Sequence, residues 1–231
     1  MIIMQPQVLV PETELDQGII KRLERCARIC YKSENRMGDA YNEGFLRRIL
    51  GGGHDSVIEH EKITVMFIVD RGITHEIVRH RIGSYSQEST RYCNYSKDKF
   101  GSEIAVIEPY FFKDRKKAYQ LWEESCQTAE GNYMLMLENG CSAQEARSIL
   151  PTCLKTEIAV TYNIREWRHF FTLRCAPEAH PQMRQAAIPL LRLFQEKLPI
   201  LFENIEYDHS FPEDQYAQVL LTDDLFQISE E

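Results

Sequence analysis

The sequence predicts one domain of mixed α/β or α+β class over residues 1–203, in which long helices flank a small antiparallel or mixed sheet, and an acidic C-terminal tail over 204–231. Three observations predict this class. The 231 residues are 43% apolar, enough to bury one substantial core. A few strand-like patterns are scattered among more numerous helical ones. No internal repeat or low-complexity segment appears.

Helices are predicted where apolar residues recur at helical spacing. The segments are 16–32, a short helix that ends at the glycines 51–53, a short helix at 72–81, a long helix at 112–138, 142–151, a helix beginning on Asn163, and 181–202 with a kink at Pro189. Ser142 and Glu145 have the spacing of a capping box, as do Asn163 and Glu166. Strands are predicted at 62–70, 102–109 and 154–163 from their β-branched and apolar content.

The charge is unevenly distributed along the chain. No Lys or Arg follows Lys197, whereas residues 1–197 carry 27 bases and 26 acids. A near-neutral body favours small anionic ligands over a nucleic acid duplex. No apolar run is long enough to span a membrane, and no signal peptide precedes the body, so a cytoplasmic protein is expected. The seven cysteines form no CxxC pair and predict reduced, mostly buried thiols.

The stretch "EIVRHRIGSYSQESTRY" concentrates three arginines and several hydroxyls after an apolar run. Guanidinium groups suit phosphate because their planar fork donates paired hydrogen bonds. Gly83 would let the backbone approach a ligand closely. If the segment is extended, Arg79 and Arg81 share a face, and if it is helical they diverge. An anion site and a solvated basic loop are equally good interpretations of this stretch alone.

Two other segments carry polar groups that chemistry could use. "GHDSVIEH" could hold a metal through its histidines and Glu59, but Ser56 with Glu59 is also a plain capping box, which is the better interpretation. "NIREWRHFFTLR" predicts an aromatic core stripe. Its other face, with Asn163, Arg165 and His169, could hold an anionic or heteroaromatic ligand.

The sequence lacks GxGxxG, GxxxxGK[ST] and GxSxG, which excludes the usual dinucleotide, phosphate-loop and serine-hydrolase motifs. The residues alone therefore indicate a small-molecule enzyme with phosphate-bearing ligands, without naming a reaction. Two other hypotheses remain: a nucleic-acid-binding protein that uses the arginine-rich loop, and a metal-dependent phosphohydrolase that uses His54, Glu59, His60 and His80.

Four blocks in order, "GHDSVIEH", "RHRIGSYSQESTRY", "EARSILP" and "YNIREWRHFFTLRCAPEAHPQMR", resemble those of the flavin-dependent thymidylate synthases. The resemblance spans about Gly51 to Arg184. It implies a non-Rossmann α/β fold and an FAD-containing homotetramer with active sites between subunits. The implied reaction converts dUMP to dTMP with methylenetetrahydrofolate as carbon donor and NADPH as reductant. It implies no metal and no nucleic acid or membrane partner.

The resemblance also implies site residues. The implied FAD contacts are Ser56, Arg79, His80, Arg81, Gln87, Asn163, Arg165 and His169. The implied dUMP contacts are Glu76, Arg79, Gln87, Glu88, Ser89, Thr90, Arg91, Arg147 and Arg174. His54 is expected beside the folate or the flavin.

Two of these residues are expected to act in catalysis. Attack through carbon five moves negative charge into the uracil ring, and Arg174 is the cation expected to stabilise it, since Arg does not act as a base. Ser89 would need His80 or Glu88 as a base to be a nucleophile, so a positioning role for its hydroxyl is preferred.

Overall fold

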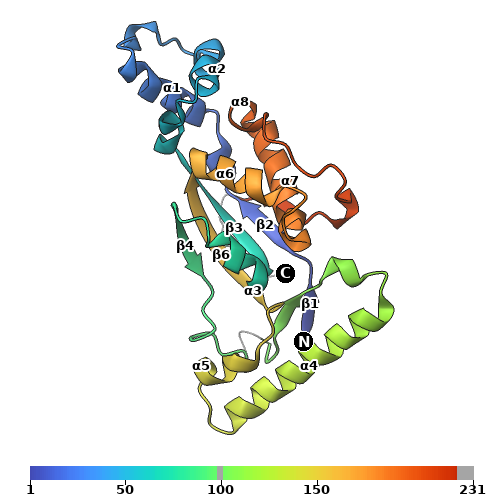
Figure 1. The fold of residues 1–231 in the computed structure, drawn as a ribbon. Helices are drawn as coiled ribbons and strands as arrows, with labels where there is room; N and C mark the ends of the chain where they lie inside the picture. Colours follow the sequence, from blue (N-terminus) through green and yellow to red (C-terminus); the bar gives the residue numbers. More distant parts are fainter. Residues whose placement is uncertain (98–100, 223–231) are drawn as a thin grey trace. The chain divides into compact units, whose positions relative to one another are not determined.

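The computed structural model describes residues 1–97 and 101–222. Its strands are scattered among its helices along the chain, as the hydrophobic pattern predicts (Figure 1). The strands are β1 (Ile2–Met4), β2 (Gln7–Val10), β3 (Lys62–Asp70), β4 (Gly83–Gln87), β5 (Ala105–Ile107), β6 (Lys155–Asn163) and β7 (Gln218–Leu221). The helices are α1 (Gly18–Cys30), α2 (Glu43–Gly51), α3 (Arg71–Ile77), α4 (Lys116–Glu138), α5 (Ala143–Ala146), α6 (Ile164–Arg174), α7 (Pro181–Lys197) and α8 (Pro199–Phe202). The mixed α/β class is confirmed.

Within the described ranges the strands form two sheets. The larger has the order β4-β6-β3-β2-β7, and the smaller pairs β1 with β5 in parallel, with Ile2 opposite Ala105. Residues of β6 alternate between buried and half-buried along its whole length, which is the period of two expected for a strand. β1, β2, β4 and β7 were not predicted, because they are short and two of them, β4 and β7, have few β-branched residues.

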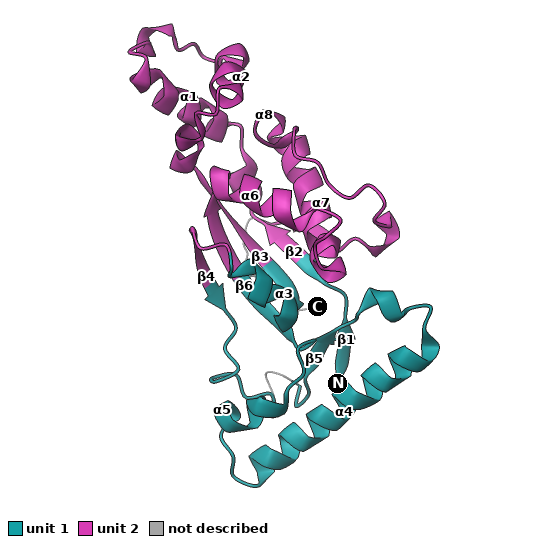
Figure 2. Cartoon of the chain, in the orientation of Figure 1, with its two compact units in different colours: residues 1–7, 67–79, 86–158 teal, residues 8–66, 80–85, 159–231 magenta. Residues whose placement is uncertain are grey.

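The chain divides into two compact units (Figure 2). Unit 1 comprises residues 1–7, 67–79 and 86–158, and unit 2 comprises the remaining residues. The chain passes from one unit to the other within β2, β3, β4 and β6 and between α3 and β4. The segment from Arg79 to Ser86 therefore starts in unit 1, crosses into unit 2 and returns.

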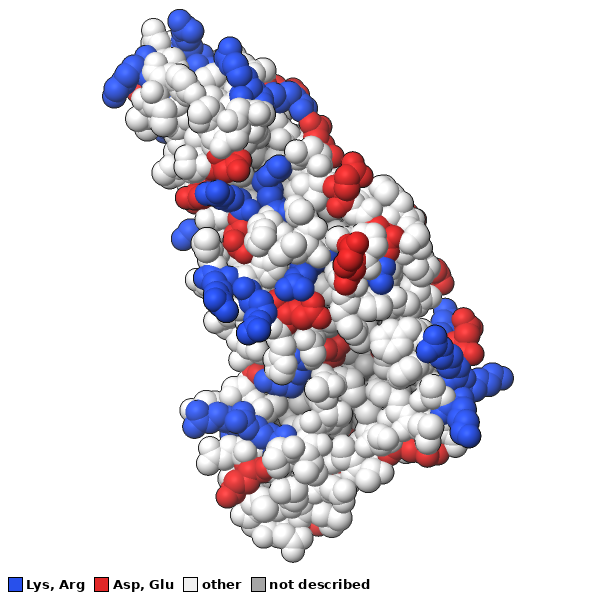
Figure 3. Space-filling view, viewed as in Figure 1, with Lys and Arg blue, Asp and Glu red and all other residues white. Residues whose placement is uncertain are grey.

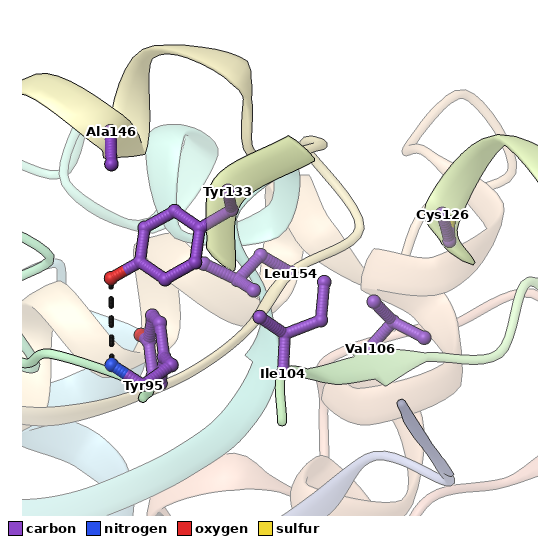
Figure 4. Packing of buried hydrophobic residues seen from close by; sticks show 7 residues of the cluster. All are labelled: Tyr95, Ile104, Val106, Cys126, Tyr133, Ala146 and Leu154. Atoms are coloured by element: carbon purple, nitrogen blue, oxygen red, sulfur yellow. Dashed lines mark hydrogen bonds between the residues drawn. The ribbon is translucent and has the colours of Figure 1, made fainter. Parts of the chain in front are cut away.

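The core of unit 1 forms around α4 (Figure 4). Tyr133 of this helix is fully buried, and its hydroxyl accepts a hydrogen bond of 3.4 Å from the backbone N–H of Tyr95. Cys126 is also buried, whereas the apolar Leu121 of the same helix is 55% exposed. The helix thus buries a narrower stripe than its apolar residues suggested.

The core of unit 2 is aromatic. Trp167 and Phe171 of α6 are fully buried and stacked, with ring centroids 5.5 Å apart, and Phe194 of α7 packs edge-on against both. The indole N–H of Trp167 donates to the carbonyl oxygen of Ile63 at 3.0 Å, so this buried polar group is satisfied. The aromatic core stripe predicted for α6 is confirmed.

Helix ends follow the predicted caps with two exceptions. The Ser142–Glu145 capping box is present, and the Asn163 side chain caps α6 by accepting from the N–H of Glu166 at 2.8 Å. The single helix predicted for 181–202 was wrong at Leu198, because the residue before Pro199 is driven out of the helical region, to φ −131° and ψ 55°. Ser56 does not cap a helix: residues 55–60 form a 3₁₀ helix whose N-cap is His54.

Residues 204–222 of the expected acidic tail contain ordered structure. Ile205, Phe211 and Ala217 are buried, and β7 joins the larger sheet. Residues 223–231 lie outside the described residues, so the boundary predicted at 203/204 stays a prediction. All seven cysteines are free, but only Cys126 and Cys175 are buried, so the expectation of mostly buried thiols was wrong. No helix in the described ranges has the length and apolar character needed to cross a membrane.

Candidate active site

A cavity of about 610 Å³ in unit 2 brings together three of the predicted flavin contacts. We call it the α6 cavity. Its lining consists of Asp55, Glu59, Ile82, Asn163, Arg165, Glu166, Arg168, His169 and Thr172. Asn163, Arg165 and His169 come from the cap and first turns of α6, so one helix sets their spacing. The residues alone had allowed a ligand on this polar face, with an exposed face as the commoner interpretation, and the family resemblance implied flavin contacts there.

The two arginines of the α6 cavity, Arg165 and Arg168, differ in how firmly their partners hold them. Arg165 pairs with Glu59 at 2.5 Å, but both side chains are about half exposed, so this ion pair contributes little to stability. Arg168 donates to the backbone carbonyl of Leu201 and to Oδ1 of Asn204, so its guanidinium is already held by two acceptors. Burial lowers the pKa of the Arg168 guanidinium. Arg165 is thus the cation best able to exchange its partner for a ligand.

A buried hydrogen-bonded chain lies beside this cavity. His80 is 3% exposed, and its Nδ1 lies 2.9 Å from Oε1 of Glu166. On the other side of the ring, Nε of Arg174 donates to Nε2 of His80 at 3.1 Å. Because Nε2 accepts this hydrogen bond, the proton of the imidazole must be on Nδ1, where it is donated to the carboxylate.

The electrostatic environment keeps His80 neutral. Burial is the main cause that lowers the pKa of this imidazole, and the nearby charges of Arg174 and His169 lower it further. The hydrogen bond to Glu166 acts in the opposite direction. A neutral His80 fixes the orientation of the Arg174 guanidinium, which a protonated ring would repel. Glu166 was predicted only as a capping residue, so sequence reasoning missed its part in this chain.

The same side chains include a possible set of metal ligands. Donor atoms of His80, Glu166 and His169 lie within 4.8 Å of one another. Both ring nitrogens of His80 already hold hydrogen bonds, so a metal would have to displace Arg174 or Glu166. The metal hypothesis from sequence used His54, Glu59, His60 and His80, and in the described part of the chain these four do not form such a group.

The other arginines of the RHR triplet are solvent-exposed. α3 ends at Ile77, so the triplet is not helical. Arg79 and Arg81 are exposed while His80 between them is buried, an alternation typical of extended chain. Gly83 approaches the ring of Tyr162, to which a Cβ atom on Gly83 would come within 2.3 Å. The close approach expected between Gly83 and a ligand is thus made to a tyrosine of the same unit.

The predicted nucleotide contacts gather in unit 1. Gln87 donates to the hydroxyls of Thr74 and Thr156, at 2.9 and 3.3 Å. Arg147 donates to the hydroxyl of the buried Thr90 at 3.3 Å, which joins the second and third predicted sequence blocks. Ser89 accepts from the backbone N–H of Arg91 at 3.3 Å. The contacts of Thr74 and Thr156 were not foreseen.

Glu88 is engaged and is thus a poor base for Ser89. Its Oε1 accepts from the hydroxyl of Tyr95 at 2.7 Å, and its Oε2 lies 3.4 Å from Nζ of Lys155. Burial, followed by the charge of Glu88, raises the pKa of the Tyr95 hydroxyl. Lys155 also contacts Glu157, and these carboxylates outweigh burial and raise the pKa of its amine. This arrangement favours Ser89 as a positioning group.

The predicted ligand residues therefore divide between the units, and neither the FAD set nor the dUMP set lies wholly in one of them. Unit 2 contains His54, Ser56, His80, Arg81, Asn163, Arg165, His169 and Arg174. Unit 1 contains Glu76, Arg79, Gln87, Glu88, Ser89, Thr90, Arg91 and Arg147. Ser56 and His54 are exposed and do not line the α6 cavity. Ligand contacts of all these residues stay predictions.

Comparison with known proteins places this arrangement in a family. Residues 13–200 match the family model described as "Thymidylate synthase complementing protein". The flavin-dependent thymidylate synthase of Geobacter sulfurreducens is 35% identical over 185 residues, which is 77% of this chain and 78% of the relative. That of Corynebacterium aurimucosum is 31% identical over 212 residues and 83% of each chain.

A solved structure shows the same fold. The UMP/dUMP methylase PolB of Streptomyces cacaoi, bound with 5-Br dUMP, superposes with a TM-score of 0.73 at 18% identity, over 88% of this chain and 96% of that one. At this identity the likeness concerns the fold alone. The family match covers the His80 chain, the α6 cavity and the unit 1 contacts alike. The chain belongs to the family of thymidylate synthase complementing proteins.

Proposed function

We propose that this protein is a flavin-dependent thymidylate synthase, in which dUMP, methylenetetrahydrofolate, NADPH and a proton give dTMP, tetrahydrofolate and NADP⁺. The names of its relatives support the reaction class, and the methylase that shares its fold was solved with a dUMP analogue. The observation that carries the proposal is Arg174, a guanidinium oriented by the neutral His80 beside the α6 cavity.

The α6 cavity suits a flavin in size and in chemistry. A volume of about 610 Å³ lies within the range of cofactor sites. Arg165 and the amide of Asn163 offer donors to phosphate and ring oxygens, and His169 offers a planar surface. FAD, when bound, supplies the redox chemistry that reduces the transferred carbon unit. The protein supplies the binding groups and their orientation.

Arg174 is the group to which we assign stabilisation of the developing charge. Attack by carbon five of dUMP moves electron density onto the uracil ring, where a fixed guanidinium lowers the free energy of the transition state. Because Nε of Arg174 donates to the buried His80, which Glu166 holds through its other ring nitrogen, little reorganisation is needed during the reaction. The side chains of Gln87 to Arg91, with Arg147, would position the nucleotide.

The remaining parts of the proposal are assembly and location. We include a homotetramer with active sites between subunits, and a cytoplasmic location, as the family resemblance implies. Size-exclusion chromatography with light scattering measures the assembly: a mass near four times 27.1 kDa is expected, and a monomer that retains full activity would contradict it.

The proposed activity is tested by absorbance spectroscopy. The purified protein, supplied with FAD, should carry a flavin spectrum that bleaches with NADPH under anaerobic conditions. Addition of dUMP and methylenetetrahydrofolate should restore the oxidised spectrum and yield dTMP. A protein that retains no flavin at saturating FAD, or a bleached spectrum that dUMP and the folate leave unchanged, would overturn the proposal.

A further inference from the structure

Unit 2 contains a second and larger cavity, of about 840 Å³, between α1 and α2. We call it the α1–α2 cavity. Its lining includes the cations Lys32, Arg36 and Arg48 and the aromatic residues Tyr31 and Phe45. No Asp or Glu belongs to this lining in the part of the chain that the structure describes. The α6 cavity, in contrast, is lined by three carboxylates, those of Asp55, Glu59 and Glu166.

A further arginine of the lining, Arg28, is already paired with a carboxylate and has a structural role. Arg28 is buried, and its Nε donates to Oε1 of the buried Glu24 at 2.6 Å. The other carboxylate oxygen of Glu24 accepts from the backbone N–H of Asn42, which anchors the start of α2. The guanidinium of Arg28 lies 4.4 Å from the ring centre of Phe45. This buried pair therefore fixes one wall of the cavity.

The three remaining cations have no such partner. Neither an ion pair nor a side-chain hydrogen bond joins Lys32, Arg36 or Arg48 to a carboxylate of the described residues. Arg48 lies 5.9 Å from the Phe45 ring centre, which holds it at the rim. Lys32 has φ 46°, an unusual left-handed conformation for a residue other than glycine. Like charges so arranged repel one another and raise the local potential for an anion.

A buried hydroxyl of the lining also lacks a partner. Ser33 is 9% exposed, and its Oγ forms no hydrogen bond among the described residues. A buried hydroxyl without a partner is unfavourable, and a ligand oxygen could satisfy it. Figure 3, viewed as Figure 1, shows Lys and Arg side chains gathered on the part of the surface that α1 and α2 form. Cavity, charge and unmatched hydroxyl all indicate an anionic ligand.

The shape and chemistry favour a nucleotide over a simple anion. The cavity is several times larger than one phosphate and falls in the range of cofactor sites. Tyr31 stands edge-on to Phe45, with ring centres 6.1 Å apart, and is 53% exposed, so its face is available to a planar base. Arginine forks bind the several oxygens of a phosphate better than they bind one carboxylate.

We propose that the α1–α2 cavity binds the phosphate groups of a nucleotide and, resting on the proposed function, that this nucleotide is the reductant NADPH. Lys32, Arg36 and Arg48 contact the phosphates, and Tyr31 packs against the adenine. The 2′-phosphate is the group that distinguishes NADPH from NADH, so these cations make the enzyme selective for the phosphorylated form.

The binding test uses adenosine 2′,5′-bisphosphate as the probe, with the full-length protein loaded with FAD. Isothermal titration calorimetry should give at least tenfold weaker binding for the double variant R36Q/R48Q than for the wild type. The control is R25Q, an exposed arginine of α1 that does not line the cavity, and its affinity should stay within twofold. Equal affinity of the double variant and the wild type would overturn the proposal.

Kinetics distinguishes between the two co-substrates that could occupy the cavity: NADPH, which carries phosphates, and the folate, which carries carboxylates. The double variant should raise KM for NADPH at least tenfold in flavin reduction, raise KM for NADH, which lacks the 2′-phosphate, by a smaller factor, and leave kcat within twofold. If instead pteroyltriglutamate binding is lost and bisphosphate binding is kept, the cavity serves the glutamate tail of the folate and the proposal is wrong. If the double variant unfolds at a lower temperature than R25Q, the single variants R36Q and R48Q replace it in the binding test. Each single variant is expected to weaken binding severalfold.

These outcomes are independent of the proposed function. Bisphosphate binding is measured without turnover, so it stands or fails whether or not dTMP forms. Absence of flavin or of dTMP would remove the assignment to NADPH and leave the nucleotide site to be judged by calorimetry alone. Normal dTMP synthesis with unchanged bisphosphate affinity in R36Q/R48Q would leave the function intact and remove the site.

Discussion

In unit 2 the predicted catalytic cation, Arg174, is held by a buried neutral imidazole, whereas in unit 1 Arg147 is held by a single hydroxyl, that of Thr90. In the first arrangement the imidazole of His80 is in turn hydrogen-bonded to the buried carboxylate of Glu166. The second arrangement ends at the threonine. A guanidinium fixed by a buried chain loses little freedom during a reaction, which suits charge stabilisation. A guanidinium on one hydroxyl can readjust to a ligand. The contrast indicates a chemical task for unit 2 and a binding task for unit 1.

The largest effect expected from this contrast is on Arg174. R174A should lower kcat for dTMP formation by about 100- to 1000-fold, the range typical for loss of one oriented charge-stabilising donor. Flavin content should stay unchanged, and the flavin spectrum checks it. The control is R192A, an exposed arginine of α7 paired with Glu213, which should keep full activity. A tenfold or smaller loss in R174A would break the comparison.

The next effect concerns how tightly the chain packs beside His80. G83A places a Cβ within 2.3 Å of the Tyr162 ring and should lower the free energy of unfolding by about 1–3 kcal/mol, as overpacking does. Denaturant titration measures this difference. G131A in α4 is the matched control, because a Cβ there meets nothing within 4 Å and alanine favours a helix. G131A should be as stable as the wild type or more stable, and equal stability of G83A would contradict the packing argument.

The neutral state of His80 predicts a pH dependence of stability. Since the folded protein lowers the pKa of His80, the unfolded chain binds more protons below the ordinary value of 6.5. The free energy of unfolding should therefore fall as pH decreases below about 6.5, by at most about 1.4 kcal/mol per pH unit from this group.

H80N should flatten this part of the stability profile. Denaturant titration at pH 7.5, 6.5 and 5.5 compares it with the wild type and with H209N, an exposed histidine. An unchanged slope in H80N would show that His80 does not titrate as its buried environment requires.

A smaller effect is expected in unit 1. T90V removes the hydroxyl that accepts from Arg147, so KM for dUMP should rise by about threefold to tenfold while kcat stays within twofold. Steady-state kinetics with dUMP as the varied substrate measures both. T128V, on the exposed face of α4, is the control and should behave as the wild type. A fall in kcat with unchanged KM would place Arg147 in the chemical step and break the comparison.

The smallest effect concerns a thiol pair of unit 1. Cys126 and Cys153 have their sulfur atoms 3.4 Å apart, and the hydrogen bond from Cys126 is the main cause that lowers the pKa of Cys153 to about 7. The indole N–H of Trp122 also donates to Cys153 at 3.3 Å. Alkylation of Cys153 by iodoacetamide should therefore rise with a midpoint near pH 7, and C126A should move the midpoint upward. Peptide mass spectrometry measures the alkylation of Cys153 at each pH, with Cys30 as the exposed reference. Equal midpoints in C126A and the wild type would contradict the role of Cys126 in lowering the pKa of Cys153.

Local patterns determined much of the fold. The β-branched and apolar content of 154–163 specified β6, the aromatic stripe specified the buried face of α6, and Asn163 and Ser142 specified helix starts. These signals depend on neighbours within a few residues of the chain, so the sequence contains them directly. β1 and β7 were missed because they comprise only three and four residues, too few for a recognisable strand pattern. The break at Leu198 was missed although Pro199 signalled it.

The candidate site depended on both levels. The sequence by itself determined which residue types were present: arginines, hydroxyls and histidines in the blocks that identify the family. Only the tertiary structure decided that Glu166 binds His80 across 86 positions, that the predicted ligand residues divide between two units, and that Lys32, Arg36 and Arg48 surround one cavity. The physical reason is that burial and the choice of partner set protonation and orientation, and neither is encoded in residue type or in spacing along the chain.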